Sequence, residues 1–423
     1  MNHKLLWFYK SLLLIGILIA GSEEAAAQKT LRVLFIGNSY TYVNDLPKTI
    51  ADIAQSRGDS LFYDSNTPGG TTFQMHCSNA TTLQKIALGN WDYVVLQAQS
   101  QEPSFPPAQV ASQTYPYAAI LDSLIHAADS CTETVFYMTW GRKNGDASNC
   151  AGYPPICTYS GMQDRLRDSY LDMAQLNHAS VVPAGEAWRR VIGEPHSFDL
   201  YQSDESHPTI FGTYLTAAAF YEVLFQKDVR GAQFLPVGIS NAILDSLQKA
   251  AHVTVQDSLA KWLQYGDIPV ARFTATQPDA VHFTNLSMNT TQVKWYFGDG
   301  DSSSAQNPVH PYHNSGNYTV RLVAANGCRS DAATAVVSVT VTGIHEGAPE
   351  LIWLQTEEGA VLLNKSTEQL GLVLTDATGS VLRAWKTNEN QIQINGSALP
   401  AGIYFLLAEK DGLTYKQKLA VIR

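Results

Sequence analysis

The sequence predicts an α/β domain of three layers, with a parallel sheet between helices, followed by two small all-β sandwich domains. Three observations lead to this prediction. Residues 30–228 alternate short apolar runs with helical patterns. After about Ile268 the runs instead alternate polar and apolar residues and are rich in Val, Thr and aromatic side chains. The length of 423 residues also exceeds that of one ordinary domain, as expected for two to three domains.

The α/β domain is predicted from the order of its apolar runs and helical patterns. Apolar runs of strand length cover residues 31–36, 93–97, 134–138 and 180–183. Helical patterns cover residues 46–57, 107–128, 161–177, 209–227 and 240–264. The first of these helices has Pro47 near its start and Gly58 after its end, the preferred places for these residues. Strands that alternate with helices predict a parallel sheet covered on both faces.

The remaining sequence predicts two β domains. The first has alternating runs at residues 281–285, 292–297, 318–324 and 335–342, with turn residues between them, which is typical of a small antiparallel sandwich. The second is predicted to have strands at residues 351–355, 360–364, 370–375, 380–385, 391–395, 402–409 and 413–422. The predicted boundaries are 28–267 for the α/β domain, 268–343 for the first β domain and 344–423 for the second.

The N-terminus has the features of an export signal. Lys4 and Lys10 precede an apolar run at residues 11–20, and three Ala at 25–27 offer a small-residue cleavage site. The run is short for a membrane span, although an uncleaved anchor is the alternative. We therefore expect residues 1–27 to be a signal peptide, and the mature chain to have no integral membrane segment.

Composition excludes several classes of protein. The net charge is −10, and the sequence has no Lys/Arg cluster, so we expect no nucleic-acid partner. Apolar residues make up 45% of the chain and charged residues 16%, which excludes a disordered protein. The only long apolar run is the N-terminal one, which excludes a polytopic membrane protein.

Export permits the five cysteines to form disulfides. Cys150 and Cys157 border a short Pro-rich loop and are predicted to pair. A metal site at these residues is the weaker interpretation, because no His lies at ligand spacing beside them. The odd number of cysteines leaves at least one thiol unpaired.

Two short segments of the first domain carry groups suited to nucleophilic catalysis. Gly37-Asn38-Ser39 follows the first strand, which places Ser39 at the carboxyl edge of the sheet, where such folds have their sites. Asp204 and His207 lie in a loop that ends at Pro208, and the carboxylate can orient the imidazole as a serine hydrolase requires. Either segment alone is more often structural, but the two together favour catalysis.

The residues around these segments resemble the SGNH (GDSL-like) hydrolase superfamily over about residues 30–230. Residues 36–41 (Ile-Gly-Asn-Ser-Tyr-Thr) match its first block, residues 67–71 (Thr-Pro-Gly-Gly-Thr) its second, and Asp204-x-x-His207 its last. The resemblance implies a flavodoxin-like α/β/α fold with Ser39 as nucleophile, His207 as base and Asp204 as the residue that orients it. It also implies that the Gly70 amide donates to the oxyanion, and that no metal or organic cofactor is needed.

The third block departs from the family pattern. The superfamily usually has Gly-x-Asn-Asp there, whereas residues 97–101 of this sequence read Gln-Ala-Gln-Ser-Gln. Gln99 is the expected substitute for the missing Asn, because its amide carries the same donor on a longer arm, and Gln97 is the second choice. The third oxyanion donor is thus open between these two residues.

Other polar residues near the blocks have two interpretations each. His76 and Arg142 are candidates for a role in the site, and a structural role is the alternative for both. Glu186 and Trp188 are candidates to line the pocket, although packing at the start of a helix is the commoner role.

The first β domain resembles the polycystic-kidney-disease-type (PKD) domain, an immunoglobulin-like sandwich found beside many secreted bacterial hydrolases. The resemblance rests on residues 295–300 (Trp-Tyr-Phe-Gly-Asp-Gly), 308–312 and 316–320. Asp299 and Asp301 raise the alternative of a calcium site, but Asp-Gly is first a tight-turn signal, and the bidentate Glu of a full calcium loop is missing.

The second β domain resembles the C-terminal sorting domain of the type IX secretion system, through residues 399–404 and 416–419. The resemblance implies a Bacteroidetes-type Gram-negative source, the type IX machinery as partner, and a secreted or outer-cell-surface location. An ordinary β-sandwich binding module is the alternative.

These features predict a secreted SGNH-type serine esterase that acts on a small-molecule or carbohydrate ester, with deacetylation of a carbohydrate as one option. The alternative is a catalytically weak or inactive SGNH scaffold that binds carbohydrate or serves adhesion at the cell surface. The altered third block favours this alternative, and the intact Ser39, Asp204 and His207 oppose it.

Overall fold

The computed structural model describes residues 28–277, 280–312, 314–339, 351–356, 359–364, 369–389, 391–395, 399–410 and 413–421. They belong to two compact units, one of residues up to 310 with 318–337, the other of residues 311–317 with those from 338 onward. The predicted signal peptide, residues 1–27, lies outside the described residues. Within the described part of the chain, no helix has the length and apolar character needed to cross a membrane.

The α/β domain is built on a five-stranded parallel sheet of order β2-β1-β3-β4-β5. Its strands are β1 (Thr30–Ile36), β2 (Ser60–Asn66), β3 (Tyr93–Leu96), β4 (Glu133–Tyr137) and β5 (Ser180–Val182). Strand β1 pairs with both β2 and β3, so the strand order reverses at β1. Ligand sites of open α/β sheets lie at such a point, outside the carboxyl ends of the strands. The predicted parallel sheet is confirmed.

Strand β2 is absent from the predicted strands. It lies at the edge of the sheet, and none of its residues is fully buried. Its sequence, SLFYDSN, therefore lacks the continuous apolar run that identifies a buried parallel strand.

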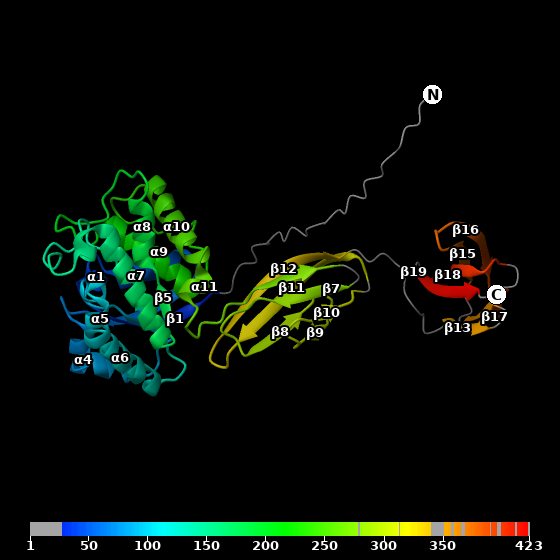
Figure 1. Cartoon of the computed structure of the whole chain (residues 1–423), viewed down its shortest axis with the longest axis horizontal. Coiled ribbons are helices and arrows are strands. Elements are labelled where there is room, and N and C mark those ends of the chain that lie inside the picture. Colours follow the sequence, from blue (N-terminus) through cyan, green and yellow to red (C-terminus); the bar gives the residue numbers. More distant parts are fainter. Residues whose placement is uncertain are drawn as a thin grey trace, which may run out of the picture. The chain divides into compact units, whose positions relative to one another are not determined.

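Helices cover both faces of the sheet, as predicted (Figure 1). Successive strand residues point to opposite faces. Val33 and Phe35 belong to a core formed with α2 (Leu46–Ser56), α8 (Ala184–Ile192), α9 (Ile210–Phe225) and α10 (Asn241–Gln256). Leu34 and Ile36 belong to a second core, formed with α6 (Tyr115–Ala128) and α7 (Tyr159–Leu176).

Several short helices lie in the connections. They are α1 (Ser39–Tyr42), α3 (Phe73–His76), α4 (Ala80–Ile86), α5 (Pro107–Gln113) and α11 (Leu259–Trp262), with the 3₁₀ turns η1 (Glu102–Ser104) and η2 (Pro154–Cys157). The single helix predicted over 107–128 is in fact α5 and α6. Pro116, which lacks a backbone N–H, lies in the first turn of α6 and starts a new helix there.

The first β domain is a sandwich of two antiparallel sheets, of order β10-β7-β6 and β12-β11-β8-β9. Its strands are β6 (Phe273–Thr276), β7 (Val281–Asn285), β8 (Gln292–Tyr296), β9 (Ser302–Ser303), β10 (Val309–His310), β11 (Gly316–Ala325) and β12 (Ser330–Val339). The buried Trp295 of one sheet packs against Phe273 and Phe283 of the other, with ring centroids 5.3 Å apart in both pairs.

The second β domain has the seven predicted strands, in sheets of order β13-β14-β17 and β16-β15-β18-β19. They are β13 (Leu351–Thr356), β14 (Gly359–Asn364), β15 (Leu370–Asp376), β16 (Val381–Thr387), β17 (Gln391–Asn395), β18 (Gly402–Lys410) and β19 (Leu413–Val421). Its core contains Leu362, Leu372 and Leu406. The predicted all-β fold of both domains is confirmed.

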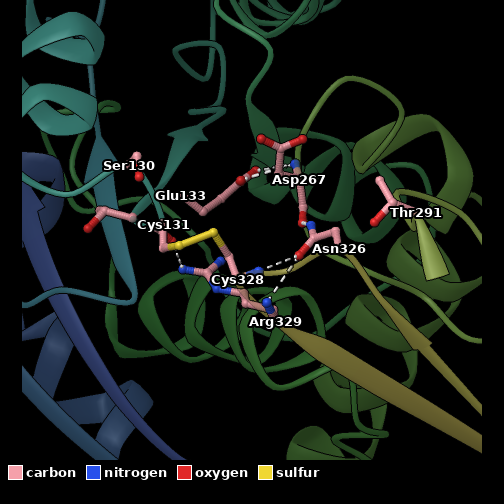
Figure 2. A pocket seen from close by; sticks show the side chains of 9 residues that line it. Ser130, Cys131, Glu133, Asp267, Thr291, Asn326, Cys328 and Arg329 are labelled. Atoms are coloured by element: carbon pink, nitrogen blue, oxygen red, sulfur yellow. Dashed lines mark hydrogen bonds between the residues drawn. A yellow bond between two sulfur atoms is a disulfide. The ribbon is translucent and has the colours of Figure 1, made fainter.

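Two disulfides are present. The predicted bond between Cys150 and Cys157 is confirmed. A second bond joins Cys131, two residues before β4, to Cys328 in the turn between β11 and β12 (Figure 2). It ties the first β domain covalently to the α/β domain. Cys77 is the free thiol among the described cysteines, and burial raises its pKa to about 11, which keeps it unreactive.

A buried carboxyl group lies beside this second disulfide. Glu133, the first residue of β4, accepts hydrogen bonds from Ser180 Oγ at 2.7 Å and from the backbone N–H of Asp267 at 3.0 Å. Burial raises the pKa of Glu133 to about 7, although the bond from Ser180 opposes this shift. Asp267 lies in the segment that leads into the first β domain, so Glu133 helps to hold that segment.

We predict that this carboxyl group makes the stability of the protein depend on pH. Because its pKa is raised on folding, the folded state binds more protons than the unfolded state between about pH 5 and pH 7. The free energy of unfolding should fall as the pH rises through this window, by on the order of 2 kcal/mol, and level off above it. Glu133→Gln should remove this component of the pH dependence.

The measurement is the melting temperature of wild type and Glu133→Gln from pH 5 to pH 8. The exposed Glu194→Gln serves as the control. Parallel curves for wild type and Glu133→Gln would contradict the assignment of this pH dependence to Glu133.

Candidate active site

Ser39, His207 and Asp204, distant in sequence, lie together beyond the carboxyl end of β1. Ser39 is the first residue of α1. Its Oγ lies 2.9 Å from Nε2 of His207, and Nδ1 of the same ring is hydrogen-bonded to Oδ2 of Asp204. Since an ionised carboxylate only accepts hydrogen bonds, Nδ1 carries the proton and Nε2 accepts from the Ser39 hydroxyl. This chain of bonds can remove the proton from Ser39 and so create a nucleophile.

Hydrogen bonds keep the carboxylate of Asp204 ionised. Its partial burial by itself would raise the pKa of Asp204. The bonds from the His207 ring and from two backbone N–H groups outweigh burial and lower that pKa. The backbone donors are Ser206 N, 3.1 Å from Oδ1, and His207 N, 3.0 Å from the same atom. Asp204 is therefore an anion that can stabilise positive charge on His207.

The loop between Asp204 and His207 has an unusual backbone conformation. Glu205 has a φ of 59°, in the left-handed region that residues other than Gly rarely adopt. A neighbouring loop supports it, because Lys143 N donates to Glu205 O at 3.0 Å and Asn144 Nδ2 donates to Glu205 Oε2 at 2.9 Å.

Buried aromatic rings support the loop that carries His207. The Tyr40 hydroxyl lies 2.7 Å from Oγ of the buried Ser206, and the indole Nε1 of Trp140 donates to Ser206 O at 3.0 Å. Tyr40 stacks on Trp140, and Trp140 on Trp188, with ring centroids 4.8 and 3.8 Å apart. The rings of Tyr40 and His207 also meet edge to face, with centroids 5.5 Å apart. Trp188 is thus a core residue, and the sequence blocks gave no sign of the role of Tyr40, Ser206 and Trp140.

The turn that presents Ser39 depends on a close contact with the third block. Gln97 is buried, and its Oε1 accepts hydrogen bonds from Asn38 N at 2.9 Å and from Thr41 Oγ1 at 3.0 Å. A Cβ on Gly37 would lie 2.7 Å from the same Oε1. A larger residue at position 37 would therefore displace the side chain of Gln97 from these hydrogen bonds.

Asn38 joins the loops of the first three blocks. Its Oδ1 accepts from Tyr40 N at 3.2 Å and so caps α1. Its Nδ2 donates to Thr71 O at 3.2 Å and lies 3.5 Å from Ala98 O. The side chain is buried, so these bonds fix the second and third blocks relative to Ser39.

The structure distinguishes the three candidate oxyanion donors. Gly70 lies in an exposed loop and has a φ of 70°, which favours Gly. Gln99 is half-buried, and its Oε1 accepts from the backbone N–H groups of Gln101 at 2.7 Å and Glu102 at 3.2 Å. Its amide nitrogen points away from these two groups and lies 3.5 Å from Oε1 of Gln101, a long hydrogen bond. Gln97 is fully buried, and its amide nitrogen is hydrogen-bonded to Ala98 O.

A polar network supports the segment that carries Gln99. Gln101 Nε2 donates to Oδ2 of the buried Asp146 at 2.7 Å. Asp146 lies four residues before Cys150 of the Cys150–Cys157 disulfide. Arg142 approaches its other carboxylate oxygen at 3.8 Å. Arg142 thus has a structural contact. Glu186 likewise accepts from Gln163 Nε2 at 3.2 Å.

His76, the last residue of α3, supports the turn of Ser39 from the helix that follows the second block. Its Nε2 lies 2.8 Å from Gly37 O, and its Nδ1 lies 2.8 Å from Thr82 Oγ1. Burial lowers the pKa of His76, although the bond to Gly37 opposes this. The neutral ring therefore donates from Nε2 to the carbonyl and accepts at Nδ1 from Thr82. His76 contacts the nucleophile turn through the backbone and does not contact Ser39 Oγ.

Two cavities have neither Ser39 nor His207 in their walls. One of about 180 Å³ lies beside Glu133, at the amino end of β4 (Figure 2). It is lined by Ser130, Cys131, Thr132, Glu133, Asp267, Thr291, Asn326, Cys328 and Arg329. A second cavity, of about 190 Å³, has Lys143, Phe198 and Tyr201 in its wall and adjoins the loop of Asp204.

Candidate metal ligands gather away from Ser39 in the described part of the chain. One group is Glu222, Asp228 and His252, and the other is Asp299, Asp301 and His310. The second corresponds to the calcium alternative in the first β domain. There His310 Nε2 lies 2.7 Å from Asp299 Oδ2, so a side chain of the protein already contacts this carboxylate.

Comparison with known families concerns the two β domains. Residues 266–341 match the family described as PKD domain, and residues 357–422 match the family described as secretion system C-terminal sorting domain. The predicted order of a PKD domain and a sorting domain is thus confirmed. The sorting domain indicates export, with a secreted or cell-surface location.

Single relatives are also similar to parts of the chain. Karilysin from Tannerella forsythia is 39% identical over 67 residues, which are 16% of this chain and only 14% of Karilysin. A DUF4886 family protein from Bacteroides uniformis is similar in structure, with 20% identity and a TM-score of 0.46, over 54% of this chain and 95% of that one. A protein from Slackia heliotrinireducens, proposed to be an SGNH hydrolase, has 25% identity and a TM-score of 0.38, over 46% of this chain and 98% of that one.

The contact between Tyr40 and Ser206 predicts an effect on the reactivity of Ser39. Tyr40→Phe removes one hydrogen bond that fixes the His207 loop but keeps the stacked ring. Such a bond contributes about 1 kcal/mol, so covalent labelling of Ser39 by a fluorophosphonate should slow about fivefold. The measurement is the second-order labelling rate. Tyr63→Phe, on the edge strand β2, is the control, and equal rates for Tyr40→Phe and wild type would contradict the positioning role.

Proposed function

We propose that this protein is an exported serine esterase of the SGNH type. The observation that carries the proposal is the continuous chain of hydrogen bonds from Ser39 Oγ through His207 to Asp204. This is the arrangement of nucleophile, general base and orienting acid that acyl transfer requires. The matched blocks around Ser39, Gly70 and His207 support the same assignment.

In the proposed reaction, Ser39 Oγ attacks the acyl carbon of an ester while His207 Nε2 takes the hydroxyl proton. The tetrahedral intermediate collapses, the ester C–O bond breaks, and His207 returns the proton to the leaving alkoxide. Water, deprotonated by His207, then attacks the acyl carbon of the acyl-enzyme. The bond from that carbon to Ser39 Oγ breaks, His207 returns the proton to Oγ, and the acid is released. Asp204 stabilises the imidazolium in both steps.

The developing oxyanion needs preorganised donors. We assign this role to the backbone N–H groups of Ser39 and Gly70 and to the side-chain amide of Gln99. The assignment of Gln99 rests on its half-buried amide, whose oxygen is held by two backbone N–H groups and whose nitrogen has a long bond, of 3.5 Å, to Gln101 Oε1 that an oxyanion would replace. Gln97 is the weaker candidate, because its side chain is fully buried and its amide nitrogen already donates to Ala98 O.

The rival function is a catalytically weak scaffold that binds carbohydrate at the cell surface. One observation favours it: a Gln stands where the superfamily has an Asn in the third block. The hydrogen-bonded Ser39, His207 and Asp204 favour turnover instead, and an assay with a short acyl ester separates the two functions.

Ser39→Ala should abolish hydrolysis of 4-nitrophenyl acetate by the mature chain. Loss of the nucleophile should lower kcat by roughly 10²–10⁶-fold without changing the melting temperature. Ser112→Ala, on α5, is the matched control. A wild-type protein without activity would favour the scaffold function, and a Ser39→Ala variant that keeps more than a few per cent of activity would mean that another residue is the nucleophile.

Replacement of the two Gln should separate catalysis from support. Gln99→Glu keeps the shape of the side chain but replaces the amide donor with a carboxylate, so kcat should fall about 100-fold while the melting temperature changes little. Gln97→Ala removes buried hydrogen bonds and should mainly lower the melting temperature. Unchanged kcat in Gln99→Glu would leave the oxyanion to backbone donors alone.

A further inference from the structure

The proposed catalytic groups lie at the surface of the α/β domain. The side chain of His207 is 31% exposed and that of Asp204 is 46% exposed. Gly69 and Gly70 of the second block are exposed as well. Such exposure lets an ester carried by a large molecule approach Ser39, so the surface beside Ser39 bears on which substrate binds.

Two apolar side chains are exposed beside this loop. Tyr42 is the last residue of α1, three residues after Ser39, and thus lies on the same side of the helical turn. It is 52% exposed, and its hydroxyl would lie only 3.6 Å from a Cβ on Gly69. Met75 is 58% exposed and lies in α3, whose first turn is capped by Thr72 of the same loop. We call Tyr42 and Met75 the apolar rim.

Exposure of single apolar residues is common and by itself means little. The position of the apolar rim is what distinguishes it. Tyr42 is one helical turn from the proposed nucleophile and touches the loop that carries the proposed oxyanion donor Gly70. A tyrosine there offers an apolar face together with a polar hydroxyl, which suits a sugar ring, with its own apolar face and hydroxyl groups.

Charge decides between neutral and anionic polymers. The whole chain has a net charge of −10. Two cations of the loop after β4 are held by carboxylates, Lys143 by Asp199 and Arg142 by Asp146. Glu205, between Asp204 and His207, is exposed. A polyanion would be repelled by this surface.

We propose that Tyr42, assisted by Met75, is the binding platform for the alcohol side of the substrate, and that this alcohol is a neutral polysaccharide. The sugar ring that carries the ester lies on the face of Tyr42, which brings the acyl group to Ser39. This inference rests on the proposed function for the reaction, but the platform also predicts binding without turnover.

The experiment compares three acetyl esters with the mature full-length chain. They are 4-nitrophenyl acetate, partially acetylated dextran as a neutral polymer, and acetylated polygalacturonate as an anionic polymer. The variants are Tyr42→Ala, Tyr42→Phe and, as matched control, Phe62→Ala. Phe62 is 60% exposed but lies on β2 four residues before its carboxyl end, roughly 13 Å down the strand.

We expect Tyr42→Ala to lower the ratio of kcat/KM on acetylated dextran to kcat/KM on 4-nitrophenyl acetate about tenfold, equivalent to about 1.4 kcal/mol. The change should lie in KM. Tyr42→Phe should keep most of the ratio, because the ring remains, and Phe62→Ala should not change it. Wild type should prefer acetylated dextran to acetylated polygalacturonate. An unchanged ratio in Tyr42→Ala would overturn the platform, and a preference for the anionic polymer would overturn its neutral specificity.

A binding measurement separates this inference from the proposed function. Ser39→Ala should bind acetylated dextran in affinity electrophoresis, and the double variant Ser39→Ala/Tyr42→Ala should migrate freely. If wild type hydrolyses none of the esters, the esterase function fails, while retardation that depends on Tyr42 would still support the platform. Equal migration of the single and double variants would overturn it.

Discussion

The absence of a side chain at Gly37 is the constraint on which the rest of the site depends. It allows Gln97 to reach the turn after β1, where one side-chain oxygen holds both Asn38 N and Thr41 Oγ1. On the other side of the turn, the neutral His76 holds the carbonyl of Gly37. The turn is thereby tied to two other loops before Ser39 makes any contact of its own. A rigid turn places the Oγ where a partner can be positioned against it.

The partner, His207, is held in a different way. It lies at the surface, where side chains usually have freedom, and its carboxylate neighbour is exposed too. The residue between them, Ser206, is buried and bonded to Tyr40 and Trp140. Stacked, buried rings are close-packed and resist displacement. The protein thus combines an accessible imidazole with a fixed position, which an exposed ion pair alone would not achieve.

The contacts that attach the first β domain to the α/β domain lie away from Ser39. The disulfide between Cys131 and Cys328 and the buried Glu133 lie at the amino end of β4, whereas Ser39 follows the carboxyl end of β1. Arg329 of the first β domain adds hydrogen bonds to Cys131 O and Asp92 O at the same place. The disulfide that attaches the PKD domain therefore does not cover the residues around Ser39. An exported protein gains from such a bond, since disulfides persist outside the cytoplasm.

Features that depend on local pattern could be predicted from the amino-acid sequence alone. Apolar runs and helical periodicity predicted the layered α/β domain and both β domains, because burial imposes a period on neighbouring residues. The turn residues Gly37 to Ser39 and the pair Asp204 and His207 were visible as short blocks, and Cys150 and Cys157 as the ends of one short loop. Tertiary structure decided what depends on contacts between distant segments. Edge strand β2 has no buried face to mark it, and Cys131 and Cys328 are 197 residues apart. The contact between Tyr40 and Ser206 forms only in the folded chain, and so do the different hydrogen bonds of Gln97 and Gln99. Hydrogen-bond partners in different loops depend on the register of the strands that carry those loops.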